Sequence, residues 1–186
     1  MAADEVFAQL SMTLVCEGDE QGMKLLRSLQ RTRARVEQRW PMPERVGDNC
    51  DILLCEFTPD LSRRYAWMPG EAKAAVIVLL PQSGRFDVGR FRAAVPDAAL
   101  HRPYTPAAVD AALSLAWDHF SFCRRQRTRI SRLDENVRSL RNIERAKHII
   151  MAARNISELN AFNVLRSMAM ERRMTVAALA ASLVDI

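Results

Sequence analysis

Hydrophobic positions along the chain follow one pattern up to residue 106 and another after it. In the first part, short apolar segments alternate with turn-forming residues, which is typical of α/β proteins. Five segments are predicted to be strands: Met12–Cys16, Ala34–Gln38, Ile52–Phe57, Ala74–Leu80 and Ala98–His101. Because the connections between them are short, we expect five parallel strands in a doubly wound sheet.

A helix is predicted between the first two strands. Asp19 is a suitable N-cap for a helix that runs roughly from residue 20 to residue 30. Its apolar residues are expected to face mostly inward: Met23, Leu25, Leu26 and Leu29.

The second part contains no glycine and no proline, because all six glycines and all eight prolines lie at or before Pro106. The 80 residues that follow are therefore expected to be helical with brief breaks. Ile130, Leu133, Val137 and Leu140 fall at positions a, d, a and d of two heptads. Two heptads do not prove a coiled coil, but a long amphipathic helix that pairs with its copy is the best interpretation. We expect a homodimer.

Three helices with a small shared core are predicted at the carboxy-terminal end. The long helix should break near Asn155, a residue that tolerates the left-handed conformation, and Ser157 and Thr175 should cap the next two helices. The residues expected to face inward are Ile143, Ala146, Ile149 and Ile150, then Leu159, Phe162, Leu165 and Ala169, then Val176, Leu179, Ala180 and Leu183.

The net positive charge of the chain lies entirely in the second part. Residues 1–106 contain 14 basic and 14 acidic side chains, whereas residues 107–186 contain 13 basic and 8 acidic ones. A neutral part joined to a basic part suggests a polyanionic partner, although a solvated helical surface would show the same balance. The start of the chain lacks the pattern of a signal peptide, and the apolar run Ala74–Leu80 is too short to span a bilayer. We therefore expect a cytoplasmic protein without membrane contact.

The sequence offers little for catalysis or metal binding. The four cysteines form no Cys-x-x-Cys pair, and the three histidines are scattered. There is no glycine-rich phosphate loop and no Ser/His/Asp set with suitable spacing. We expect no enzymatic activity, no metal and no cofactor.

The last part of the chain resembles a known RNA-binding module. Its motifs are Ile143-Glu144-x-Ala146-Lys147-x-Ile149, then Ile156-Ser157-Glu158-x-x-Ala161-Phe162-x-x-Leu165-Arg166-x-x-Ala169, then Val176-x-x-Leu179-Ala180-x-x-Leu183-Val184. This spacing is similar to the ANTAR domain of transcription antitermination regulators of the AmiR and NasR type. Asn155 stands where that family often has glycine, and asparagine is the next best residue for the turn.

Residues 1–106 resemble the receiver domain of response regulators, with a departure at the site of phosphorylation. Glu56 stands where a working receiver has its phosphoacceptor aspartate, Leu80-Pro81 stands where a hydroxyl residue is expected, and Arg102 precedes Pro103 where lysine is usual. The resemblance therefore implies a pseudo-receiver. Glu56 either mimics a phosphorylated aspartate and pairs with Arg102, or is simply an exposed acid at a strand end.

One further segment, "VEQRWPMPE" from Val36 to Glu44, resembles the matching stretch of AmiR-type antiterminators. In that branch, a ligand-sensing partner of the periplasmic-binding-protein type (AmiC-like) silences RNA binding until an inducer arrives. Trp40 is then a possible partner contact, or it only covers the edge of the sheet.

Together these resemblances imply three segments: a pseudo-receiver at 1–106, a dimerisation helix at 107–141 and an ANTAR domain at 142–186. They also imply a function, namely binding to hairpins in a nascent mRNA leader so that a terminator cannot form. Cations are needed to grip the RNA backbone. The candidate RNA-binding residues are Lys147, Arg166, Arg172, Arg173 and Arg154. A protein-interaction adaptor and a DNA-binding transcription factor remain alternatives.

Overall fold

The computed structural model describes residues 6–47, 49–68, 70–81 and 87–184. The chain divides into two compact units, Met1–Cys123 and Arg124–Ile186, which we describe separately. The elements of the first unit are β1 (Ser11–Val15), α2 (Glu20–Arg31), β2 (Arg35–Arg39), β3 (Ile52–Glu56), α3 (Leu61–Arg64), β4 (Ala75–Leu80), α4 (Val88–Ala93) and β5 (Ala98–His101). The helix α5 (Pro106–Arg154) begins in the first unit and ends in the second, where α6 (Glu158–Glu171) and α7 (Val176–Val184) follow.

The first unit is built on a five-stranded parallel sheet in the order β2-β1-β3-β4-β5. All five predicted strands are confirmed, and no strand end differs from the prediction by more than about one residue. This order is that of a doubly wound sheet of the flavodoxin type. The central strands β3 and β4 are buried on both faces, which explains their continuous apolar sequences.

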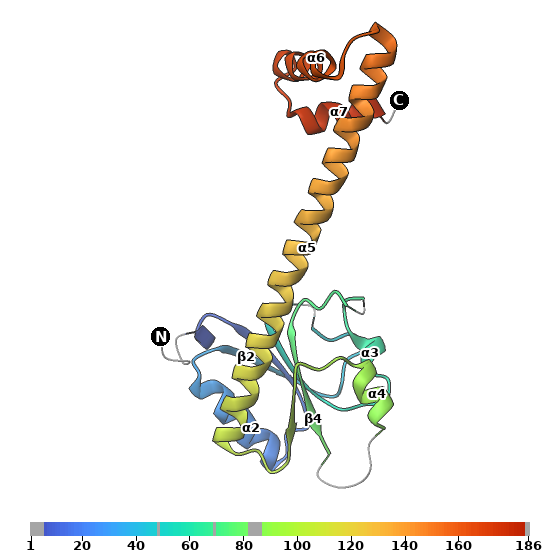
Figure 1. The fold of residues 1–186 in the computed structure, drawn as a ribbon. Coiled ribbons are helices and arrows are strands. Elements are labelled where there is room, and N and C mark those ends of the chain that lie inside the picture. Colours follow the sequence, from blue (N-terminus) through green and yellow to red (C-terminus); the bar gives the residue numbers. More distant parts are fainter. Residues whose placement is uncertain (1–5, 48, 69, 82–86, 185–186) are drawn as a thin grey trace. The chain divides into compact units, whose positions relative to one another are not determined.

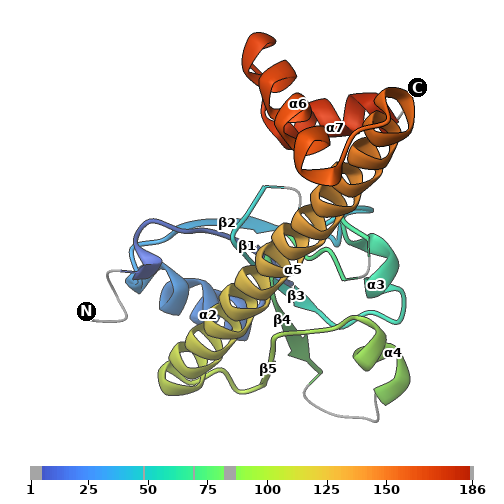
Figure 2. The same ribbon diagram turned by 45° about the horizontal axis from the view of Figure 1, so that its top comes forward.

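Helices cover both faces of this sheet (Figures 1 and 2). On one face α2 and the first turns of α5 pack on β1, β3 and β4, whereas α3 and α4 pack on the other face. The first of these two cores includes Met12, Leu14, Leu25, Leu29, Ile52, Leu54, Val109, Leu113 and Phe120. The start of α5 is therefore a structural part of the first unit.

The predicted helix after β1 is confirmed as α2, including its cap. The carboxylate of Asp19 accepts a hydrogen bond of 2.7 Å from the backbone N–H of Gly22. Leu25 and Leu29 are buried, one turn apart. The prediction for Met23 was wrong, because this side chain is 39% exposed beside the buried stripe rather than in it.

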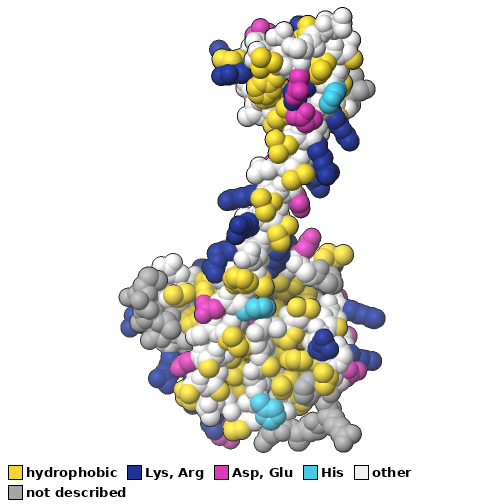
Figure 3. Space-filling view, in the orientation of Figure 1, with side chains coloured by type: hydrophobic (Ala, Val, Ile, Leu, Met, Phe, Trp, Pro, Cys, Tyr) yellow, Lys and Arg dark blue, Asp and Glu magenta, His cyan; other side chains and the backbone are white. Residues whose placement is uncertain are grey.

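Beyond the first unit, α5 carries an exposed apolar stripe. Ile130, Leu133, Val137 and Leu140 are each 45–63% exposed, and Figure 3 shows hydrophobic side chains interspersed with basic ones along this stretch. These four residues, here called the seam, repeat at the 3–4 residue spacing of a helix that packs against another helix in a coiled coil. None of the described helices combines the length and the apolar character needed to cross a membrane.

The carboxy-terminal unit contains the predicted helix breaks and caps. Asn155 adopts a positive φ of 50°, and α6 and α7 follow their expected caps. The Ser157 hydroxyl accepts a hydrogen bond from the N–H of Asn160 at 3.4 Å, and the Thr175 hydroxyl accepts one from Ala178 at 3.1 Å.

The core of this unit is made largely of small side chains. Its buried residues are Ala146, Ile150, Ala161, Leu165, Ala169, Leu179 and Ala180. Three residues that were predicted to face inward are instead exposed: Ile149 by 47%, Leu159 by 71% and Phe162 by 38%. The reason is geometric, since alanines let the helices approach closely and leave no room between them for a phenylalanine.

Candidate nucleic-acid interface

Lys147 lies in the last turns of α5 and is almost covered. Its side chain is 10% exposed, and its ammonium lies 2.8 Å from Oε1 of Glu144 and 2.5 Å from Oε1 of Glu158. Hydrogen bonds to Glu144 and Glu158 raise the pKa of Lys147, and the bond to Lys147 lowers the pKa of Glu158. Because Glu158 is the first residue of α6, the lysine ties the end of α5 to the start of α6.

Two carboxylates occupy two of the three N–H donors that an ammonium offers. One donor of Lys147 therefore remains for another acceptor, and the local charge of Glu144, Lys147 and Glu158 together is negative. The contact between Lys147 and Glu144 could be predicted from the sequence, because the two residues are three positions apart on a helix. The contact with Glu158 crosses a turn and could not be read from helical spacing.

The four candidate arginines are exposed. Arg154 ends α5, Arg166 lies in the middle of α6, Arg172 is the C-cap of α6, and Arg173 follows with a φ of 53°. Within the part of the chain that the structure describes, no carboxylate forms an ion pair with any of these four guanidinium groups. Their charge is therefore available to an external anion.

Phe162 gives this basic surface an aromatic group. It lies one turn before Arg166 on α6, so the two side chains project from the same side of the helix. An exposed ring beside a guanidinium can stack on an unpaired base while the cation contacts a phosphate. Its role could not be predicted from the sequence, because the apolar character and spacing of Phe162 suggested burial.

Glu56 and Arg102 meet at the carboxyl ends of the strands in the first unit. Nη2 of Arg102 lies 3.3 Å from Oε1 of Glu56, and the same guanidinium pairs with Asp19. It also lies 5.6 Å from the centre of the Tyr104 ring. Burial opposes the charge of Arg102, but the interactions with Asp19 and Tyr104 together outweigh burial, so the pKa of Arg102 is raised.

This ion pair borders a small pocket. The pocket has a volume of about 290 Å³, and it is lined by Glu17, Glu56, Phe57, Leu79, Leu80, Pro81, Arg102 and Tyr104. Asp19 is held twice, by Arg102 and by the N–H of Gly22, and both bonds lower its pKa. Within the described residues, no group of three or more His, Cys, Asp or Glu side chains could hold a metal ion.

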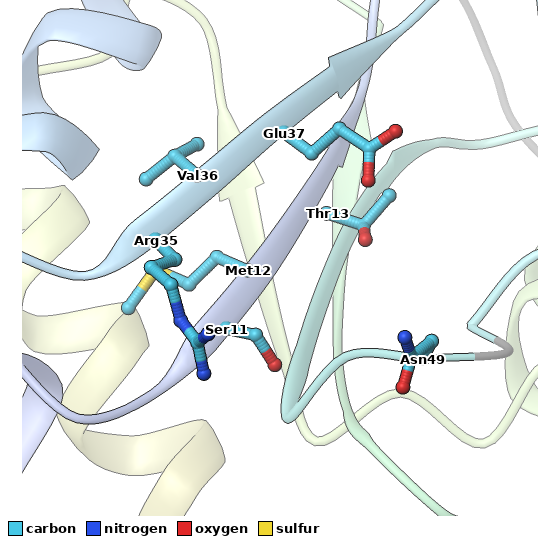
Figure 4. A pocket seen from close by; sticks show the side chains of 7 residues that line it. All are labelled: Ser11, Met12, Thr13, Arg35, Val36, Glu37 and Asn49. Atoms are coloured by element: carbon cyan, nitrogen blue, oxygen red, sulfur yellow. The ribbon is translucent and has the colours of Figure 1, made fainter.

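Trp40 lies directly after β2, which is an edge strand of the sheet, and is 49% exposed. It therefore does not cover the sheet edge completely and is accessible to a partner. A second opening, of about 450 Å³, lies at the other end of the same edge and involves Ser11, Met12, Thr13, Arg35, Val36, Glu37 and Asn49 (Figure 4). Asp51 already accepts hydrogen bonds from Ser11 there, and Arg35 is the single basic residue lining the opening, so it offers little to a polyanion.

The sequence of most of the second unit matches a known domain. Residues 131–184 match the ANTAR domain. The match includes every motif residue on which the sequence resemblance was based, and it begins inside α5, ahead of residue 142. All five candidate cations therefore lie within the ANTAR domain.

Solved structures similar to this chain include two from response regulators. A low-resolution structure of the response regulator StyR is 15% identical, with a TM-score of 0.49, and the alignment covers 96% of this chain and 100% of that one. The receiver domain of a response regulator from Bermanella marisrubri is 17% identical, with a TM-score of 0.38, over 53% of this chain and 90% of that one.

A third structure, a fusion that contains the trimeric coiled coil of yeast Spc42, is 12% identical with a TM-score of 0.46. That alignment covers 72% of this chain and 95% of the fusion. No curated protein matches the sequence.

Proposed function

We propose that this protein is a transcription antiterminator that binds hairpins in a nascent mRNA leader as a dimer and prevents a terminator from forming. The observation that carries the proposal is an ANTAR domain whose exposed surface presents Phe162 and four arginines that form no ion pair with any described carboxylate. Stems of RNA hide their base edges, so proteins contact loop bases and the phosphate backbone. The planar ring and the guanidinium groups suit these two tasks.

The five cations have different roles in this proposal. Arg166 is the closest in sequence to Phe162 and would contact the phosphates that flank a stacked base. Arg154, Arg172 and Arg173 lie at the helix ends and would grip the stem. Lys147 would contribute its one remaining donor, and it would also hold α5 and α6 in the geometry that binds RNA.

The dimer in this proposal forms through the seam. A monomer would leave four apolar side chains of α5 in water, and pairing with a second copy buries them. Two ANTAR domains in one dimer can bind two adjacent hairpins, and the second contact then benefits from a high effective concentration. We therefore expect a leader with two adjacent hairpins to be bound more tightly than a leader with one hairpin.

The first unit would act as a regulatory domain that does not depend on phosphorylation. Glu56 replaces the phosphoacceptor and is already paired with Arg102, which supports the interpretation that it mimics a modified aspartate. The resemblance of residues 36–44 to AmiR-type proteins suggests control by a ligand-sensing partner of the periplasmic-binding-protein type. Trp40, exposed at the sheet edge, is the residue we propose for that contact.

A selection experiment tests the proposed function without knowledge of the target. A pool of RNAs that carry two adjacent hairpins with randomised loops is incubated with the full-length protein, and bound RNAs are sequenced. We expect enrichment of defined loop sequences in both hairpins. A pool that shows no enrichment, together with retention of any duplex DNA, would favour a DNA-binding protein, and no retention at all would favour a protein-interaction adaptor.

A further inference from the structure

Three side chains outside the proposed RNA site form a chain of hydrogen bonds in the first unit. Nδ1 of His119 lies 2.6 Å from Oδ1 of Asp97, and Nε2 of the same ring lies 3.6 Å from Sγ of Cys123. His119 and Cys123 are one turn apart on α5, and Asp97 directly precedes β5. The sequence separates Asp97 from the other two, so only the fold brings the three together.

The contact with Asp97 favours one tautomer of His119. A carboxylate can only accept, so Nδ1 of His119 carries the hydrogen that it donates to Asp97. In the neutral imidazole Nε2 is then unprotonated and accepts from the thiol of Cys123. Asp97 is itself fixed, since its side chain is 10% exposed and its second oxygen accepts a 2.8 Å bond from the N–H of Val76.

An oriented imidazole next to a thiol is the arrangement that activates cysteine as a nucleophile. We propose that Cys123 is a modification site that reacts with a low-molecular-weight disulfide bearing carboxylates, with His119 as general base and Asp97 as its positioning residue. Arg124 and Arg125 follow directly and are exposed, so the surroundings attract an anionic reagent.

The reaction is a thiol–disulfide exchange. The thiol proton of Cys123 passes to Nε2 of His119, and the resulting thiolate attacks one sulfur of the disulfide. The bond between the two reagent sulfurs breaks as the bond to Cys123 forms. The other sulfur leaves as a thiolate and takes the proton from His119, so one thiol is consumed, one is released, and no further oxidant is required.

The other three cysteines are poorly suited to this reaction. Burial raises the pKa of Cys16 to about 11, and it also raises the pKa of Cys50 and of Cys55. Because the thiolate is the reactive form, these thiols react slowly near neutral pH. Cys16, Cys50 and Cys55 therefore serve as internal controls in a test of whether Cys123 reacts selectively.

The test exposes the full-length protein to glutathione disulfide at neutral pH and locates the adduct by peptide mass spectrometry over time. We expect Cys123 to be modified first. His119→Gln should slow its modification by about 10-fold or more, since general-base assistance commonly contributes at least that much. His119 is half exposed on a helix surface, so this variant should fold like the wild type.

His101→Gln is the matched control, because His101 is exposed and is bonded to a backbone carbonyl rather than to a cysteine. It should leave the rate unchanged, whereas Asp97→Asn should slow it. Equal rates in the wild type and in His119→Gln would overturn the proposal. So would a preference for Cys16, Cys50 or Cys55, or the formation of a disulfide between two copies of Cys123 with no glutathione adduct.

Discussion

The exposed position of Phe162 has the largest effect on how we expect the protein to recognise RNA. With this ring buried, His148 and the arginines would be left for stacking in the ANTAR domain. Its 38% exposure places an aromatic face beside Arg166. Burial failed as a prediction because hydrophobic spacing identifies the inner side of a helix but does not tell a core of alanines from one of larger residues.

Phe162→Ala should therefore weaken binding to a selected hairpin RNA and leave the fold intact. Loss of one base-stacking contact costs about 1–3 kcal/mol, which corresponds to roughly 5-fold to 150-fold in Kd. Fluorescence anisotropy measures the affinity, and a thermal melt measures the fold. Leu159→Ala is the control, because Leu159 is more exposed on the same helix and offers no ring. A large drop in Tm with no change in RNA affinity would show that Phe162 has a packing role instead.

The ion pair between Lys147 and Glu158 makes the stability of the ANTAR domain depend on pH in the acid range. The pKa of Glu158 is lowered from its ordinary 4.5 by the bond to Lys147. A carboxyl group with a lowered pKa contributes stability that is fully present above its unfolded pKa and is lost as the pH falls through its folded pKa.

Glu158→Gln should therefore have a lower Tm than the wild type at pH 7, and the difference should shrink as the pH falls well below 4.5. Because the side chain of Glu158 is 67% exposed, the effect at neutral pH should be modest. Thermal melts at a series of pH values measure it. A difference that stays constant down to pH 2 would contradict the ion pair.

At the scale of elements, α5 performs two separate tasks along one continuous helix. Its first turns complete the core of the first unit through Val109, Leu113 and Phe120, and its later turns expose the seam. Counting heptads backwards from Ile130 places Val109, Ala116 and Cys123 at position a as well. Val109 and Ala116 are instead buried against the sheet, because 3.5-residue spacing identifies a face but not the surface that covers it.

Leu133→Asp should convert the proposed dimer to a monomer, because pairing would then bury two unpaired like charges in an apolar contact. Sedimentation velocity over a range of protein concentrations measures the change. Arg132→Ala, next to it in sequence and also exposed, should leave the assembly unaltered. A wild-type protein that stays monomeric at high concentration, or a Leu133→Asp variant that stays dimeric, would show that the seam does not pair.

Much of the architecture could be predicted from the sequence because local signals agree with the fold. The apolar runs of β3 and β4, the cap at Asp19 and the helix break at Asn155 each express a requirement of the backbone within a few residues. The contacts between functional side chains were less predictable. Arg102 bonds to Asp19 and His119 bonds to Asp97, and no local sequence pattern predicts these contacts because the partners lie far apart in the sequence.

At the scale of the whole molecule, the first unit should be unable to accept a phosphoryl group. Incubation with acetyl phosphate and Mg²⁺ should leave the intact mass of the protein unchanged, because Glu56 is not the aspartate that receivers phosphorylate and is already paired with Arg102. A stable gain in mass on Glu56 would contradict the assignment as a pseudo-receiver.

The central claim is that the ANTAR domain binds folded RNA through its exposed arginines and Phe162. The most direct test measures the Kd of the full-length protein for a selected two-hairpin RNA as a function of salt concentration. We expect affinity to fall steeply with salt, and the slope of log Kd against log salt to decrease by about one for Arg166→Ala. A duplex DNA of equal length should bind more weakly. Equal affinity for duplex DNA, or a salt slope unchanged in Arg166→Ala, would contradict the account.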